Sequence, residues 1–324
     1  MSQSTVYIFA NPYSGSGENK RYVAELVEHL AAQNIQGQPV WELEQRHKIL
    51  TDPNLPQHCN TVVSAGGDGS LGDVVNELNL ANNLPHINIA ILPLGNENLV
   101  AKEFNFSLDT KTLANAIARN QHTSIDLGQI TSQTNQQSEP SPYQGNCFTF
   151  MLSAGFDAQV VYNFDHWRKN TSSTNTNAKK RATRLNYIPI ITKTAFTYPF
   201  PQIEMTTDDG QTITGCYIFA FLIDQYAGGL SIPDQVITND GKIDWVVFQK
   251  PGCLNALKYM TLIALKKHLK TKHVITGRSK SLTIKPLNST DQIPVQIDGD
   301  IGGRLPLALT THKQALRILD INAD

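Results

Sequence analysis

The chain has 324 residues, of which 40% are hydrophobic and 17% are charged. This composition is typical of a globular protein, and the length suits one large domain or two ordinary ones. Lys and Arg number 27 against 28 Asp and Glu, a formal net charge of −1. Such a balance provides no general attraction to nucleic acid, so nucleic acid is not an expected partner.

Several common sequence signals are missing. The first residues lack a basic segment followed by an apolar run, and no apolar run is long enough to cross a bilayer. The four cysteines form no C-x-x-C pair, and the nine histidines show no H-E-x-x-H spacing. These features predict a cytoplasmic protein with reduced thiols, without a disulfide framework or a zinc site.

Strand and helix patterns alternate in the first part of the chain. Apolar runs predict strands at Val6–Ala10, Thr61–Ala65 and Ile87–Leu94, and a helix is expected at Asn96–Phe104. Two further helices are predicted by apolar residues at i, i+3, i+4 and i+7, namely Val23, Leu26, Val27 and Leu30, and then Leu71, Val74, Val75 and Leu78. This alternation is typical of βαβ units that form a parallel sheet.

The pattern changes after about Ile125, where short strand-like runs are separated by glycine-bearing turns. The runs are Cys147–Ser153, Ile203–Thr207, Thr212–Ile223, Ile243–Phe248, Leu282–Lys285, Pro294–Asp298 and Leu305–Thr310. Helices are expected at about Ala182–Phe196 and Cys253–Leu269. We therefore predict a Rossmann-like parallel α/β domain over residues 1–125 and an antiparallel β-sandwich domain over residues 126–310. Residues 311–324 are a segment that could pack back on the first domain.

Three loops in the first half each follow a predicted strand and precede a predicted helix: Asn11–Gly17, Gly66–Gly69 and the loop at Gly95. At the carboxyl edge of a parallel sheet, helix N-termini offer N–H groups to phosphates, and glycine lets a phosphate approach the backbone. The recurrence of the loop favours phosphate binding over a plain strand-to-helix turn. Neither the P-loop nor the G-x-G-x-x-G fingerprint is present.

Carboxylates accompany these loops. Asp68 lies inside the second loop and cannot itself bind a phosphate, so its position suggests Mg²⁺ and phosphoryl transfer. Asp298 and Asp300 are separated by one glycine at the end of a predicted strand. That spacing suits a joint role as base and metal ligand, and an Asp-Gly hairpin turn explains it about equally well.

The order of seven motifs resembles the diacylglycerol kinase catalytic-domain family over about Val6–Asp300. The motifs are NPYSGSG, AGGDGSLGDVVNEL, LPLGNENLVAKEF, IDLG, FTFMLSAGFDAQV, DGKIDWVVF and QIDGD. The resemblance implies a lipid kinase that uses ATP and Mg²⁺ to phosphorylate the hydroxyl of a diacylglycerol-like or sphingoid-like lipid. It implies Asp298 as general base, with Asp300 and Asp126 in the same catalytic network. The metal ligand that we predict, Asp68, follows from its position in the second glycine loop. The nucleotide-binding residues that the resemblance implies are Asn11, Ser14, Gly15, Gly17, Gly66, Gly67, Asp68, Gly69, Ser70, Gly95, Asn96 and Asn98.

The third loop departs from the family's usual G-T-x-N-D-F-A-R. Asn96 stands in place of the threonine, and Leu99 stands in place of the acid. Two alternatives to a lipid kinase therefore stay open. One is a kinase of a soluble metabolite of the NAD kinase type, and the other is a nucleotide-binding regulatory protein with reduced activity on a kinase fold.

A lipid substrate implies peripheral contact with a membrane surface. Leu254–His273 carries apolar residues at helical spacing, and lysines 266, 267, 270 and 272 gather near its end. This stretch could lie on an anionic surface. The preferred alternative is a core-packed helix whose lysines complement its dipole. The oligomeric state stays open, with a homodimer among the options.

Overall fold

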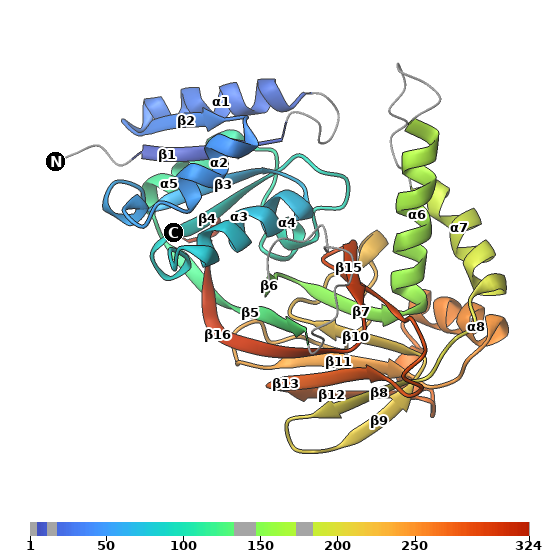
Figure 1. Ribbon diagram of the computed structural model, residues 1–324. Coiled ribbons are helices and arrows are strands. Elements are labelled where there is room, and N and C mark those ends of the chain that lie inside the picture. The colour runs from blue at the N-terminus through green and yellow to red at the C-terminus, as the bar shows by residue number, and fades with distance from the viewer. Residues whose placement is uncertain (1–4, 12–17, 133–146, 173–183, 324) are drawn as a thin grey trace. The chain divides into compact units, whose positions relative to one another are not determined.

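The computed structural model describes residues 5–11, 18–132, 147–172 and 184–323. The chain divides into two compact units. Figure 1 labels the helices and strands of both. The first comprises Met1–Leu127, Thr238–Gly241 and His312–Asp324, and the second comprises Gly128–Ile237 and Lys242–Thr311. Thr238–Gly241, which the predicted division assigned to the second domain, thus belongs to the first unit.

The first unit is built on a parallel sheet with the strand order β2-β1-β3-β4. The strands are β1 (Thr5–Ala10), β2 (Gln36–Val40), β3 (Thr61–Gly66) and β4 (Asn88–Pro93). β16 (Leu307–Leu319) adds a parallel bridge in which Ile318 pairs with Ile89 of β4. Every residue of β3 is buried. Burial on both faces explains why this strand reads as a continuous apolar run, as is typical of parallel sheets.

Helices pack around this sheet. They are α1 (Asn19–Ala32), α2 (Leu43–Leu50), α3 (Asp68–Leu80), α4 (Leu99–Glu103) and α5 (Thr110–Arg119), with 3₁₀ turns at Leu55–Gln57 and Leu84–His86. α1 packs against α5, and α2 packs against α3. The predicted apolar face of α3 is buried throughout. The helix predicted from Asn96 begins only at Leu99, because Asn98 has a left-handed backbone conformation with φ of 53°.

The second unit is an antiparallel β-sandwich. One sheet has the order β12-β11-β10-β7-β14-β15, and in the other β13 pairs with β16 and with β8, which pairs with β9. Buried residues of both sheets, such as Trp245 and Met205, share one core. The remaining strands are β5 (His122–Ser132), β6 (Cys147–Phe148), β7 (Met151–Gly155), β8 (Ile203–Thr207), β9 (Thr212–Gly215), β10 (Tyr217–Phe221), β11 (Ile243–Phe248), β12 (Val274–Ser279), β13 (Ser281–Pro286), β14 (Pro294–Ile297) and β15 (Asp300–Arg304).

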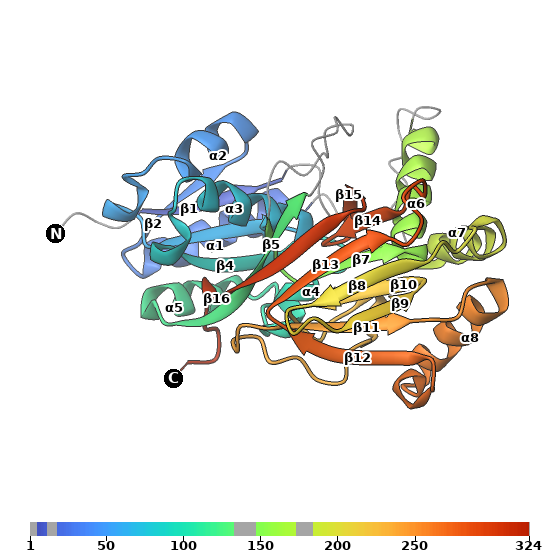
Figure 2. The same cartoon turned by 60° about the horizontal axis from the view of Figure 1, so that its bottom comes forward.

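Three helices belong to the second unit: α6 (Phe156–Ser172), α7 (Arg184–Thr197) and α8 (Cys253–Ala264), with 3₁₀ turns at Ala227–Gly229 and His268–Lys270. α6 packs against α7, and α7 against α8, as Figure 2 shows. α8 ends before the predicted Leu269, because Lys266 adopts a left-handed conformation with φ of 52°. Within the described ranges, no helix is both long enough and apolar enough to span a bilayer.

Candidate active site

The second and third glycine loops of the first unit touch each other backbone to backbone. The N–H groups of Leu94 and Gly95 donate to the carbonyl oxygen of Gly66, at 2.9 and 3.1 Å. A Cβ atom on Gly95 would lie only 2.3 Å from the Cα of Gly67. Glycine is therefore required here because one loop approaches the other, whether or not a phosphate also approaches.

Asn98 holds the third loop in shape. Its Oδ1 accepts the N–H of Gly95 at 3.0 Å, and its Nδ2 donates to the carbonyl oxygens of Pro93 and Gly95, at 3.2 and 3.0 Å. The amide of Asn98 thus bonds within its own loop, whereas the side chain of Asn96 is exposed. Of the two amides of this loop that were predicted to contact a nucleotide, Asn96 is the one placed at the surface.

Asp68 caps helix α4. Its Oδ1 accepts the N–H of Val100 at 3.2 Å, and the N–H of Leu99 also bonds to this carboxylate. Burial raises the pKa of Asp68, and these hydrogen bonds oppose the rise. The residues that the structure describes include no group of three acids, histidines or cysteines able to hold a metal ion. Magnesium ligation by Asp68 stays a prediction, with part of the carboxylate already engaged.

The N-termini of α1, α2 and α3 differ from those of α4 and α5. α4 receives Asp68, and α5 is capped by Asp109, whose Oδ1 accepts two backbone N–H groups at 3.1 Å. The N-cap residues of α1, α2 and α3 are Glu18, Glu42 and Gly67, and none of them accepts a hydrogen bond from the first turn through a side chain. Each of these helices follows a strand of the parallel sheet, and the N–H groups and positive dipole end of a helix N-terminus favour an anion.

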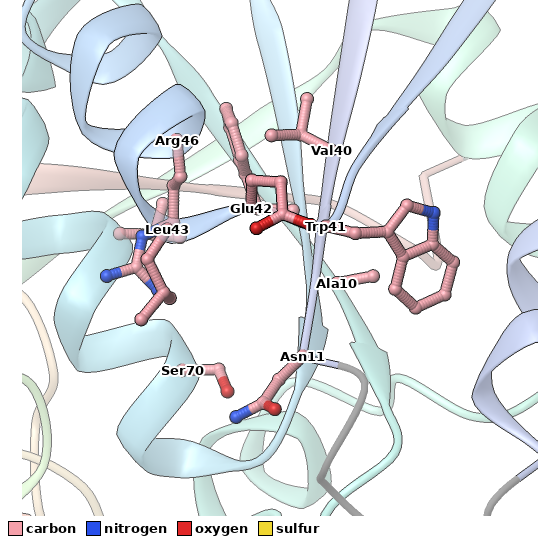
Figure 3. A pocket seen from close by; sticks show the side chains of 10 residues that line it. Ala10, Asn11, Val40, Trp41, Glu42, Leu43, Arg46 and Ser70 are labelled. Carbon is pink, nitrogen blue, oxygen red and sulfur yellow. The ribbon is translucent and has the colours of Figure 1, made fainter.

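A small pocket opens at this same edge, between the ends of β1 and β2 and the start of α3. Figure 3 shows Asn11 and Ser70 at one end of it, and Leu43 and Arg46 farther along. Asn11 and Ser70 were both predicted to contact nucleotide, and the structure brings them together. The predicted residues Ser14, Gly15 and Gly17 lie outside the described residues.

The same pocket contains residues that sequence reasoning missed. Trp41, Glu42 and Arg46 line it, and all three follow β2, which was not predicted because QGQPV lacks an apolar run. The guanidinium of Arg46 is paired with Glu77 at 2.7 Å and with Asp73 at 3.1 Å. Because Arg46 is already neutralised by α3, the pocket is not strongly basic. Its cavity volume is about 10 Å³, which is room for about one water molecule.

Asp126 fastens three segments of the first unit together. Its Oδ2 accepts the N–H of Gly241 at 2.6 Å, and its Oδ1 accepts the N–H of Gln314 at 2.8 Å. Its own N–H donates to the carbonyl oxygen of Thr238 at 2.7 Å. Burial raises the pKa of Asp126. These contacts explain why Thr238–Gly241 belongs to the first unit, and they give Asp126 a structural role.

Asp298 is the most fully bonded acid in the second unit. Its Oδ2 accepts the N–H and the hydroxyl of Thr149, at 2.6 and 2.8 Å, and its Oδ1 accepts the N–H groups of Phe150 and Met151, both at 3.0 Å. The side chain is 3% exposed. Burial raises its pKa to about 6, although these hydrogen bonds oppose the rise. The break between β6 and β7, where a single strand was predicted, supplies these donors.

Asp298 and Gly299 form the two-residue turn between β14 and β15. Both have positive φ, 50° and 86°, as a type I′ hairpin turn requires. The Asp-Gly pattern is thus a hairpin signal, as one of the two interpretations held. Asp300 is the first residue of β15 and is exposed. The four acceptor sites of the Asp298 carboxylate are filled, which leaves Asp300 as the acid of this turn that faces solvent.

A second buried acid supports the same turn. Asp157, in the first turn of α6, accepts hydrogen bonds from Ser153 Oγ at 2.6 Å and from the hydroxyl of Tyr226, and it also bonds to Gln296. Gln296 in turn accepts the N–H of Gly299 through Oε1, at 2.8 Å. Burial raises the pKa of Asp157. The turn is therefore held on both sides, by Asp298 itself and by the Asp157–Gln296 pair.

Comparisons with known proteins agree with this architecture. Residues 5–130 match the family model described as the diacylglycerol kinase catalytic domain, and residues 151–320 match the model described as the YegS C-terminal NAD kinase beta sandwich-like domain. The fold is thus that of a kinase with a parallel α/β unit and a β-sandwich unit. The chain belongs to the diacylglycerol kinase catalytic-domain family, and the predicted family and fold class are confirmed.

The relatives are distant in sequence. A diacylglycerol kinase of Staphylococcus carnosus is 24% identical over 82% of this chain and 78% of that protein. One of Bacillus subtilis is 22% identical over 76% and 72%. A crystal structure of a diacylglycerol kinase from Bacillus anthracis superposes with a TM-score of 0.67 at 18% identity, over 98% of this chain and 97% of that one. At such identity the structural likeness shows the fold alone.

Proposed function

We propose that the protein is a lipid kinase that transfers the γ-phosphoryl group of ATP to a lipid hydroxyl. The observation that carries the proposal is the carboxyl edge of the parallel sheet, where α1 and α3 begin without a side-chain cap beside the Gly66–Gly67 loop. These N–H groups suit the phosphates of a nucleotide, and Asn11 and Ser70 lie together at the same edge of the sheet.

We assign proton acceptance to Asp300 rather than to Asp298, which revises the expectation drawn from the family resemblance. A general base needs a carboxylate oxygen that can reach the hydroxyl proton. Both oxygens of Asp298 are engaged by Thr149–Met151, whereas Asp300 is exposed one residue beyond Gly299. Asp298 then acts as a positioning residue, because its hydrogen bonds fix the turn that presents Asp300.

In the proposed reaction, the lipid hydroxyl oxygen bonds to the γ-phosphorus of ATP, and the bond from that phosphorus to the β,γ-bridging oxygen breaks. ADP leaves with the bridging oxygen, and the hydroxyl proton passes to Asp300. Magnesium, when it binds with the nucleotide, neutralises charge on the phosphates.

The direct test is turnover of Mg²⁺-ATP against lipids with a free hydroxyl, namely diacylglycerol, sphingoid bases and phosphatidylglycerol, with NAD as a soluble comparison. We expect phosphorylation of at least one lipid, and Asp300→Asn should reduce kcat at least 100-fold. Asp208→Asn, in the exposed β8–β9 turn, is the matched control and should leave kcat unchanged. Phosphorylation of NAD alone would refute a lipid kinase in favour of the soluble-metabolite alternative.

A second candidate function rests on Leu99. This residue stands where the family has an acid, and it is buried at the start of α4, directly beside the carboxylate of Asp68. A nucleotide-binding regulatory protein would tolerate this loss better than an enzyme would. Calorimetry that detects ATP binding, together with no transfer to any acceptor in the panel, would favour the regulatory function.

A further inference from the structure

Helix α8 turns an apolar face outward. Ala256, Tyr259 and Ile263 form its buried face. Leu254, on the opposite face, is 83% exposed, and Leu257 and Met260, nearer to the buried face, are each 37% exposed. A surface helix of a globular protein normally presents polar residues to water. Core packing, the preferred interpretation of the sequence, therefore accounts for only one side of α8.

Basic residues accompany this apolar face. Between Cys253 and Lys272 the sequence contains five lysines and no Asp or Glu. Lys258 lies on the helix within one turn of Leu254 and Leu257, and the others follow its end; all five are exposed. They are Lys258, Lys266, Lys267, Lys270 and Lys272. The surface of α8 thus combines exposed leucines with a concentrated positive charge, although the whole chain has a net charge of only −1.

The neighbouring helix α7 continues this composition. It packs against α8, as Figure 2 shows, and its fourteen residues include no acid. Phe196 is 72% exposed, and Ile188 lies two turns earlier with more than half of its surface exposed. Lys193 is exposed between them. Large apolar side chains and a lysine therefore reach the surface on both helices.

We propose that α8 and the following turn His268–Lys270 form a docking surface for an anionic lipid membrane. This inference rests on the proposed function, because a kinase that phosphorylates lipids must bind the membrane that contains them. Leu254, Leu257 and Met260 would enter the apolar boundary of the bilayer while the lysines contact anionic headgroups, as in helices that lie in the membrane interface.

Charge decides between a membrane and a second copy of the chain. In a symmetric dimer the same face meets itself, so the five lysines of each copy would be brought together with no acid on α8 to neutralise them. Anionic headgroups supply the missing negative charge. The apolar face alone fits either occupant, and the combination with unopposed lysines fits the membrane.

Co-sedimentation with vesicles tests the docking surface without any need for catalysis. We expect the wild type to bind vesicles of phosphatidylglycerol and phosphatidylcholine, and to bind pure phosphatidylcholine much more weakly. Replacing two lysines, Lys266→Gln with Lys267→Gln, should weaken binding about 25-fold at low salt, at about five-fold per lysine. Leu254→Asp with Leu257→Asp should weaken it at least ten-fold, because two apolar side chains no longer enter the bilayer.

The matched control is Leu80→Asp, at the end of α3 in the first unit, where the leucine is 63% exposed. It should bind vesicles like the wild type. Vesicle binding that both α8 variants retain would overturn the proposal. Sedimentation velocity tests whether a second copy of the chain binds this face instead. A wild-type dimer that Leu254→Asp converts to a monomer, with vesicle binding unchanged, would also overturn the membrane proposal. Circular dichroism identifies a misfolded leucine variant, in which case the lysine pair still decides.

Activity measurements separate this inference from the proposed function. With a short-chain, water-soluble diacylglycerol, the α8 variants should keep the wild-type kcat, and with vesicle substrate they should lose turnover in proportion to binding. Equal turnover of vesicle substrate by wild type and variants would refute the docking surface and leave the kinase proposal standing. Vesicle binding that depends on α8, with no phosphorylation of any lipid, would refute the kinase proposal and support the docking surface.

Discussion

Asp298→Asn tests whether this buried carboxylate anchors the hairpin or accepts the proton. The asparagine keeps the shape, and its carbonyl oxygen can still accept the N–H groups of Phe150 and Met151. Its NH₂ group then faces Thr149, whose hydroxyl can rotate to accept a hydrogen bond while its N–H loses its partner. One buried unsatisfied N–H costs about 1–3 kcal/mol.

The lost charge acts in the opposite direction. Burial raises the pKa of Asp298 from 3.8 to about 6. At about 1.4 kcal/mol per pKa unit, the ionised side chain therefore lowers the stability of the folded state by about 3 kcal/mol at neutral pH. Asparagine does not carry this penalty. The two effects largely cancel, so the variant should unfold within about 2 kcal/mol of the wild type at pH 7.

The pH dependence gives the sharper measurement. Because the pKa is raised in the folded state, the folded protein binds more protons than the unfolded one between about pH 4 and pH 6. The contribution of Asp298 to stability is thus greatest below pH 4 and is lost as the pH rises to 6. Urea unfolding across this range should show a fall of about 3 kcal/mol that is absent from Asp298→Asn. Asp68, Asp126 and Asp157 also have raised pKa values, and they remain in both proteins.

Kinetics then distinguish the two roles. If Asp298 positions the turn, Asp298→Asn lowers kcat through a displaced Asp300, and the acidic limb of the kcat–pH profile stays. Asp300→Asn should remove that limb, because the substitution removes the proposed proton acceptor. A limb near pH 6 that disappears in Asp298→Asn, together with an active Asp300→Asn, would refute the assignment of Asp300 as the proton acceptor.

Three further predictions concern the first unit. Gly95→Ala should destabilise it by about 2 kcal/mol or more in urea unfolding, because the new Cβ would overlap the backbone of Gly67; a loss below that of Gly67→Ala, whose Cβ has a nearest contact of 3.2 Å, would contradict the loop contact. Asp68→Asn keeps an acceptor for the α4 amides and should melt like the wild type, whereas Asp68→Ala should lose about 1 kcal/mol; if calorimetry shows that both variants bind ATP with the wild-type Mg²⁺ dependence, Asp68 is not the metal ligand. Asp126→Ala leaves the N–H groups of Gly241 and Gln314 without their acceptor, so it should cost about 2–4 kcal/mol and open Thr238–Gly241 to proteolysis, and unchanged protease resistance would argue against the fastening role.

Local sequence patterns predicted strands that are buried on one face, such as β8, or on both faces, such as β11. β8 and β11 have the bounds that their apolar runs indicate, because burial requires continuous or alternating apolar residues. β2 and α6 were not predicted, because their sequences lack such a pattern of apolar residues. QGQPV at β2 contains one buried residue, and α6 is rich in polar side chains. Their positions are set by tertiary contacts that no local window contains.

The roles of the site acids were harder to predict because their partners are remote in the sequence. The donors to Asp298 lie almost 150 residues earlier in the chain, and Gln314 lies 188 residues after Asp126. A motif identifies an acid, but it cannot show whether the oxygens of that acid already accept hydrogen bonds. The sequence therefore indicated where carboxylates are concentrated, and the structure was needed to separate the exposed Asp300 from the enclosed Asp298.

In the Gly66–Gly67–Asp68 loop, too, the structure shows contacts that the motif alone does not indicate. Its glycines allow contact with Gly95, and its acid caps α4, so the loop first joins two strand-to-helix connections into one rigid edge. Leu99 is consistent with that use, because an acid there would lie buried beside the Asp68 carboxylate, and two such charges repel. In the kinase that we propose, the N-termini of α1 and α3, rather than a pair of acids, would receive the phosphates of the nucleotide.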